Sequence, residues 1–132
     1  MGTITSEIIL SSTDLLTDTL DINTTATITA SHTTGLARRP ITSTAKGTAS
    51  GQVTLYTSDD FTNKEVYLYV KNTDDTSTDY VYIFDDAVTG DPDWISLKGG
   101  EWAFLPIGYQ TTLKAYAQTS GTVVEWMVFG TD

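Results

Sequence analysis

The chain has 132 residues, which is enough for one domain with a single core and too few for two ordinary domains. It contains no cysteine, which excludes disulfides and thiolate metal sites, and no apolar run approaches the roughly 20 residues that span a bilayer. Its 17 acidic and 7 basic residues give a formal net charge of -10, which disfavours binding to nucleic-acid phosphates. The first residues lack a basic segment followed by an apolar run, so we expect no secretory signal.

The first fifty residues contain no aromatic side chain and a great deal of threonine. Residues 21–30 alternate apolar or small residues with polar ones, the period of two that is expected of a half-buried strand. The alternating residues are Ile22, Thr24, Ala26, Ile28 and Ala30. Residues 4–10 are a second strand candidate, and residues 13–20 show only weak helical spacing. This part is expected to form outer strands over the aromatic part, or an extended threonine-rich arm that packs against another chain.

From residue 31 to residue 51 the composition is small, polar and glycine-rich, with no sustained period. Such a long loop is unusual in a compact domain, and we expect it to be ordered only by contact with a partner. Arg38 and Arg39, followed by Pro40, are the only arginines. Their planar forks suit an acidic partner or a neighbouring protomer, although a solvated pair of charges is equally compatible with the sequence. His32 is the only histidine, and one imidazole does not make a zinc site. We expect it to be a surface residue of this loop.

Regular strand patterns resume at residues 52–57 and 65–71. In the second of these, Val66, Leu68 and Val70 share one face while Tyr67 and Tyr69 share the other. Apolar bulk on both faces predicts a central strand, or a strand whose outer face contacts another subunit. The polar residues 72–79 then predict a hairpin that joins 65–71 to 80–84.

Short strands separated by turn-formers fill the rest of the chain. The expected strands are 80–84, 94–97, 101–105, 112–117 and 123–129, with Gly, Pro and Asp between them. This spacing predicts an all-β protein, either an antiparallel sandwich or a barrel. Of the two we expect a jelly-roll-like antiparallel β-sandwich. Residues 1–51 would supply the arm, peripheral strands and long loop, and residues 52–132 the sandwich body.

Four carboxylates gather around the turn that follows residues 80–84: Asp85, Asp86, Asp91 and Asp93. An acidic loop of this kind is a weak calcium candidate, since calcium prefers several oxygen ligands. The segment lacks the regular alternation of a calcium-binding loop, and aspartate is also a common turn residue. No metal or other cofactor is therefore expected.

Four aromatic residues raise the alternative of a carbohydrate-binding module: Trp94, Trp102, Tyr109 and Trp126. Trp102 and Trp126 lie within apolar strands, however, where burial is the expected outcome. Glu101 and Glu125 are the carboxylates that a hydrolase would use, but no supporting motif lies near either one. With no cysteine, no Ser-His-Asp pattern and no glycine-rich phosphate loop, we expect no enzymatic activity.

A resemblance rests on the last half of the chain. Residues 95–107 read Ile-Ser-Leu-Lys-Gly-Gly-Glu-Trp-Ala-Phe-Leu-Pro-Ile, and 112–117 and 122–130 follow as Thr-Leu-Lys-Ala-Tyr-Ala and Thr-Val-Val-Glu-Trp-Met-Val-Phe-Gly. This succession resembles small virion proteins of tailed bacteriophages, with a Leu-Lys-small-Gly-Glu turn, an aromatic strand ending in Leu-Pro and a closing Val-Glu-aromatic strand. Residues 70–73 and 80–83 fit the same pattern, whereas the N-terminal third matches none.

The resemblance implies a capsid decoration (cement) protein, made in the host cytoplasm and located on the outside of a phage head. Its implied partner is the major capsid protein, which it would bind as a homotrimer. Our own hypothesis from the residues is that segment 1–51 makes the trimer and capsid contacts. The candidate contact residues are Arg38, Arg39, Pro40, Tyr67 and Tyr69. A head-to-tail or tail-associated virion component is the alternative within the same class. Neither nucleic acid nor membrane is an expected partner.

Overall fold

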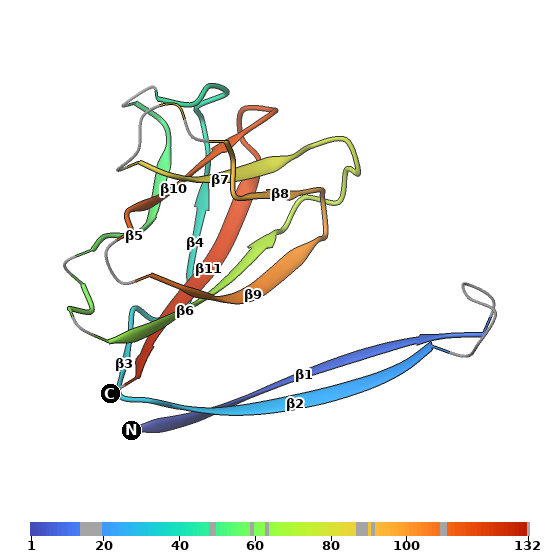
Figure 1. The fold of residues 1–132 in the computed structure, drawn as a ribbon. Helices are drawn as coiled ribbons and strands as arrows, with labels where there is room; N and C mark the ends of the chain where they lie inside the picture. Colours follow the sequence, from blue (N-terminus) through green and yellow to red (C-terminus); the bar gives the residue numbers. More distant parts are fainter. Residues whose placement is uncertain are drawn as a thin grey trace.

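The computed structural model describes residues 1–13, 20–47, 50–58, 60–62, 64–86, 90, 92–108 and 111–131. Throughout these ranges the regular elements are β-strands, and no helix there is long and apolar enough to cross a membrane. Two antiparallel sheets pack together as an all-β sandwich, which confirms the predicted fold class (Figure 1). A two-stranded hairpin projects from this sandwich.

Each sheet combines strands that are distant in the sequence. The four-stranded sheet has the order β5 (Val53–Tyr56), β10 (Leu113–Ala117), β7 (Val81–Asp85), β8 (Ile95–Leu97). The five-stranded sheet has the order β3 (His32–Thr33), β11 (Val123–Thr131), β6 (Glu65–Asn72), β9 (Trp102–Ile107), and β4 (Ala37–Pro40) also pairs with β11. The predicted strands from residue 52 onward therefore exist, with bounds that differ by one or two residues. As expected, β6 is a central strand.

The core lies between the two sheets because one set of alternate side chains on each strand points inward. From β6 these are Val66, Leu68 and Val70, all at most 1% exposed, and Leu113 and Ile83 meet them from the other sheet. Burial of such aliphatic side chains contributes roughly 1.5–3 kcal/mol each, and no disulfide assists them. The sandwich is thus stabilised by packing.

The hairpin consists of β1 (Gly2–Ser12) and β2 (Leu20–Ala30), antiparallel from the pair Gly2↔Ala30 to the pair Ser12↔Leu20. We call β1 and β2 together the arm. The two predicted strands within it, 4–10 and 21–30, are confirmed, and residues 14–19 of the weak helical segment lie outside the described residues. The end of the arm at the pair Ser12↔Leu20 extends well beyond the sandwich, while the start of β1 lies near the end of β11 (Figure 1).

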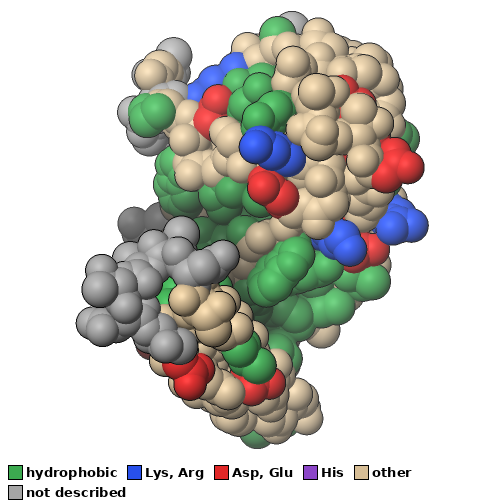
Figure 2. Space-filling model, turned by 90° about the vertical axis from the view of Figure 1, so that its right-hand side faces the viewer, with side chains coloured by type: hydrophobic (Ala, Val, Ile, Leu, Met, Phe, Trp, Pro, Cys, Tyr) green, Lys and Arg blue, Asp and Glu red, His purple; other side chains and the backbone are tan. Residues whose placement is uncertain are grey.

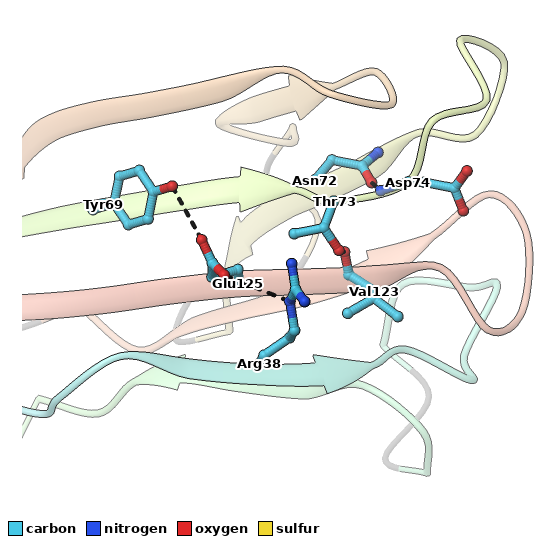
Figure 3. A network of polar contacts seen from close by, with 7 residues as sticks. All are labelled: Arg38, Tyr69, Asn72, Thr73, Asp74, Val123 and Glu125. Carbon is cyan, nitrogen blue, oxygen red and sulfur yellow. Dashed lines mark hydrogen bonds and ion pairs between the residues drawn. The ribbon is translucent and has the colours of Figure 1, made fainter.

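The expected hairpin of residues 65–71 with 80–84 is wrong. β6 pairs with β11 and β9, whereas β7 pairs with β10 and β8 in the other sheet. Both strands carry an apolar row, and these rows face one another across the core instead of lying side by side in one sheet. The connection between them crosses the end of the sandwich, where the buried side chain of Asn72 holds it (Figure 3).

The loop expected at residues 31–51 is likewise not free of regular structure. β3 and β4 pair with β11 of the same chain, and Ile41 is fully buried in the core. Main-chain hydrogen bonds tie the segment down further, including Ser31 N–H to the carbonyl of Gly130 at 2.9 Å. The described part of 31–51 thus needs no partner to be ordered. The arm ends at Ala30, and the division expected at residue 51 falls inside the body.

Candidate interaction surface

The outer face of the five-stranded sheet carries large apolar side chains where a solvent-facing surface would carry polar ones. We call the set Tyr67, Tyr69, Trp102, Phe104, Met127 and Phe129 the aromatic face. These side chains alternate with the inward-pointing ones along β6, β9 and β11. They remain half-buried or exposed, because the sandwich itself has nothing to place over them.

Strand register brings these side chains together. Tyr69 lies opposite Met127 on one neighbouring strand and opposite Phe104 on the other. The ring of Phe104 stacks on that of Tyr67 at 5.9 Å between centroids and meets Phe129 edge-on at 6.4 Å. Pairs of this geometry stabilise by about 0.5–1.5 kcal/mol beyond the area they bury, so the face is a rigid platform.

One end of the face is polar. Tyr69 donates a hydrogen bond of 3.2 Å from its hydroxyl to Oε1 of Glu125, and Nε of Arg38 lies 3.5 Å from Oε2 (Figure 3). Burial raises the pKa of Tyr69, and the hydrogen bond to Glu125 adds to this effect. The Glu125 carboxylate is thus held by two neighbours as part of the surface.

The base of the arm packs over the same face. Ile28 and Ala30 are buried there and Ile4 is half-buried. Beyond them the arm and the face enclose an open groove of about 260 Å³, lined by residues 4–8 of β1 and by Tyr69, Trp102, Phe104 and Phe129. Figure 2 shows hydrophobic side chains gathered along the hollow between the arm and the sandwich.

No protein-family model, curated protein or solved structure matches this chain.

The arginine pair is positioned by β4. Arg38 and Arg39 lie opposite Glu125 and Val124 of β11, and Pro40 lies opposite Val123. The expectation that these residues lie in a loop is wrong, because all three belong to strand β4. Their side chains are nevertheless exposed. Arg38 joins the polar end of the aromatic face. The candidate contacts Tyr67 and Tyr69 lie on this face as well, and Glu125 links Arg38 to Tyr69, whereas Tyr67 lies farther along the sheet, opposite Phe129.

The acidic residues of the weak calcium candidate have separate neighbours. Asp85 is buried and accepts a hydrogen bond from the N–H of Thr112, while Asp86 pairs with Lys114 and Asp93 with Tyr116. Asp91 lies outside the described residues. Among the described side chains no group of three or more His, Asp or Glu is arranged to hold a metal ion.

The tryptophans divide differently from the expectation. Trp126 is buried at 6% exposure, but Trp102 is 58% exposed and Trp94 is 42% exposed. The expected burial of Trp102 is wrong because its strand is apolar in both phases, and register places Trp102 outward, opposite Lys71. Tyr109 lies outside the described residues.

The remaining candidates are engaged in local structure. Glu101 accepts a hydrogen bond of 2.8 Å from the N–H of Lys98 and so closes the turn before β9. His32 is exposed at the edge strand β3, where Ser31 Oγ lies 2.8 Å from its Nδ1 and the ring of Phe61 meets it edge-on. Neither residue lines the groove.

The outer face of the four-stranded sheet holds a second aromatic cluster. Tyr82 stacks on Tyr116 at 4.8 Å, and the Tyr116 hydroxyl donates a 2.8 Å hydrogen bond to Oδ2 of Asp93. Lys46 lies 3.5 Å from the other oxygen of Asp93 and 5.0 Å from the centroid of the Phe84 ring. Burial, with the Asp93 carboxylate second, raises the pKa of Tyr116 above its ordinary value of 10.0. Oδ2 of Asp93 is thus hydrogen-bonded, whereas its buried Oδ1 has the ion pair with Lys46 and, within the described part of the chain, no hydrogen bond. Unlike the aromatic face, this cluster has charged groups packed against its rings.

Proposed function

We propose that this protein is a non-enzymatic structural subunit that joins neighbouring proteins of a larger assembly, specifically a decoration protein on the outside of a phage head. The single observation that carries the proposal is the arm, which projects from the sandwich with its apolar side uncovered along its outer half. A two-stranded hairpin is marginally stable alone in water, so such an element is best explained by a partner that covers it.

The dimensions of the arm suit bridging. Each strand has 11 residues, which at roughly 3.3 Å per residue gives an arm about 35 Å long. Residues 1–30 contain four acidic residues and no Lys or Arg, so the arm's partner should present apolar and basic groups. The arm has two faces and so can serve two contacts, one with a neighbouring copy through its apolar row and one with the assembly through its acidic, polar face. The resemblance of residues 95–130 to phage virion proteins is what names the assembly partner as the major capsid protein.

Two further features support this reading. Strands β4-β11-β6-β9 and β5-β10-β7-β8 form facing rows, and successive strands alternate between the rows except at β7 and β8. This order supports the jelly-roll-like form of the sandwich. The non-enzymatic part of the proposal is supported by the engagement of Glu101 and Glu125, the two carboxylates considered for hydrolysis, in local hydrogen bonds.

Removal of residues 1–30 tests the proposal. We expect the truncated protein to lose co-sedimentation with undecorated phage heads, while the buried Trp126 still shows the fluorescence and cooperative unfolding of a folded sandwich. A control that replaces Trp94, exposed directly before the edge strand β8 of the other sheet, by alanine should bind heads as the wild type does. Full binding by the truncated protein would refute the proposal.

A carbohydrate-binding module is the second candidate, favoured by the exposed ring of Trp102 beside the groove. Exposed aromatic rings are suited to stacking on sugar faces. In that case soluble glycans should quench tryptophan fluorescence in the wild type and in Trp94→Ala, but not in Trp102→Ala. Absence of quenching with glycans of the host surface removes this candidate.

A further inference from the structure

The arm has one apolar face and one polar face along its whole length. Residues with even numbers on β1 lie opposite even-numbered residues on β2, so Ile4, Ile8 and Leu10 share a face with Ile28 and Ile22. The odd-numbered face carries threonines, Glu7, Asn23 and Asp21, with Ile9 as its one large apolar residue.

Only the base of this apolar row is covered. Ile28 is buried and Ile4 half-buried against the sandwich, whereas Ile8, Leu10 and Ile22 are 51%, 50% and 43% exposed. The pattern typical of a half-buried strand therefore continues past the point where the chain's own body can bury it. The outer half of the row presents the same chemistry that the aromatic face already accepts at the base.

The aromatic face also has more apolar surface than its own arm covers. The groove beside residues 4–8 is open, and Trp102 at its edge is 58% exposed. Contact with the base of one arm leaves this edge free for a second apolar strand. The part of the aromatic face that the chain's own arm covers and the part that remains open are thus continuous on a single surface.

The charges of the two surfaces are complementary. Residues 1–30 carry Glu7, Asp14, Asp18 and Asp21 and no basic residue. In the row of the sheet that begins at Trp102, Lys71 and Arg38 lie on either side of Glu125, which gives this row a net positive charge, while Glu7 of the chain's own arm lines the opposite side of the groove. An acidic arm is therefore attracted to the face of another copy even though the chains as wholes repel each other.

We propose that the occupant of the free part of the aromatic face is the outer half of the arm of a second copy of this chain. Each chain has one arm and one face, so the contact closes either as a reciprocal pair or as a ring such as the expected trimer. The inference rests on the proposed function only in assuming that the chain is a structural subunit, and it makes no use of the capsid.

Matched substitutions on the two faces of the arm test this. We expect light scattering to show a multimer for the wild type, and Ile22→Thr, at a residue of the apolar row that does not line the groove, to weaken self-association about tenfold or more, because it removes apolar contact and buries a hydroxyl. Ile9→Thr makes the same chemical change at a residue that is 59% exposed on the polar face, and should leave the mass unchanged. On the sandwich, Trp102→Ala should dissociate the multimer and Trp94→Ala should not.

Mixing provides a test that folding defects do not mimic. Ile22→Thr keeps the groove and the aromatic face intact and Trp102→Ala keeps an intact arm, so at a concentration where each variant alone is monomeric an equimolar mixture should form a mixed complex. A monomeric wild type, equal effects of Ile22→Thr and Ile9→Thr, or a mixture that stays monomeric would each overturn the inference. A wild-type multimer that fails to bind phage heads refutes the capsid proposal and leaves this one standing, and head binding by a monomer does the reverse.

Discussion

Asn72 is the side chain whose replacement should test the account of the fold most sharply. It is fully buried at the end of β6 and connects three segments of main chain. Its Nδ2 donates to the carbonyls of Asp79 at 2.7 Å and Leu97 at 3.1 Å. Its Oδ1 accepts from the N–H of Asp74 at 3.1 Å, and Figure 3 shows these two residues side by side. These bonds join the end of β6 to two other segments: the connection that leads from β6 to β7, and the last residue of β8.

The expected cost of Asn72→Ala follows from these three bonds. A neutral hydrogen bond contributes about 1 kcal/mol net, and a main-chain group left buried without a partner costs about 1–3 kcal/mol. Water can reach the half-buried Asp74 and Asp79 more readily than Leu97, so we expect a loss of about 2–4 kcal/mol. Asn72→Asp should cost more at neutral pH, because a buried carboxylate would face two carbonyl oxygens.

Urea unfolding followed by tryptophan fluorescence measures these losses, with the buried Trp126 as the main reporter. Asn23→Ala is the matched control, because Asn23 is exposed on the polar face of the arm, and it should change the free energy of unfolding by less than about 0.5 kcal/mol. Equal stabilities of Asn72→Ala and Asn23→Ala, or a wild-type stability for Asn72→Asp, would refute this account of the crossover.

Two further predictions concern pH and backbone packing. The raised pKa of Tyr116 stabilises the fold fully below the ordinary value of 10.0, and this contribution is lost as pH rises above 10.0, where the unfolded chain releases the proton first. Urea midpoints should therefore fall less steeply above pH 10.0 in Tyr116→Phe than in the wild type. Gly99→Ala should destabilise by about 1–3 kcal/mol, because the new Cβ would overlap the carbonyl oxygen of Thr76, as thermal unfolding would show.

Each of these has its own control. Tyr69 also has a raised pKa, so Tyr116→Phe should reduce the alkaline loss of stability without abolishing it, and an unchanged loss would contradict the prediction. For the glycine, Gly2→Ala adds a methyl group where no atom lies within 4 Å and should be neutral. If Gly99→Ala were equally neutral, the inferred close approach of Gly99 to the carbonyl group of Thr76 would be refuted.

Local sequence pattern was sufficient for the strands themselves. The alternation at residues 21–30 and 65–71 reflects the pleat of a single strand, which places successive side chains on opposite sides whatever the partner is. The same alternation predicted either a central strand or a strand whose outer face contacts another subunit, since apolar residues occur in both phases, and β6 is central in its sheet. The all-β class follows from these local facts and from the Gly, Pro and Asp residues between the strands.

Pairing between strands was not predictable in the same way. β6 pairs with β11, more than fifty residues later, and not with β7, because the connection between β6 and β7 crosses from one sheet to the other. Residues 31–51 show no periodic pattern, yet β4 is fixed by main-chain hydrogen bonds to β11, a partner that their own side chains do not encode.

For the candidate surface, the sequence by itself determined that Tyr67 and Tyr69 share a face and that the arm carries an alternating apolar row. Only the tertiary structure decided that Trp102 lies outward beside them, because its strand is apolar in both phases and register alone chooses the exposed side. Likewise, only the tertiary structure shows where the cover of the arm ends: the row continues from Ile28 to Ile22, but the sandwich beneath it does not.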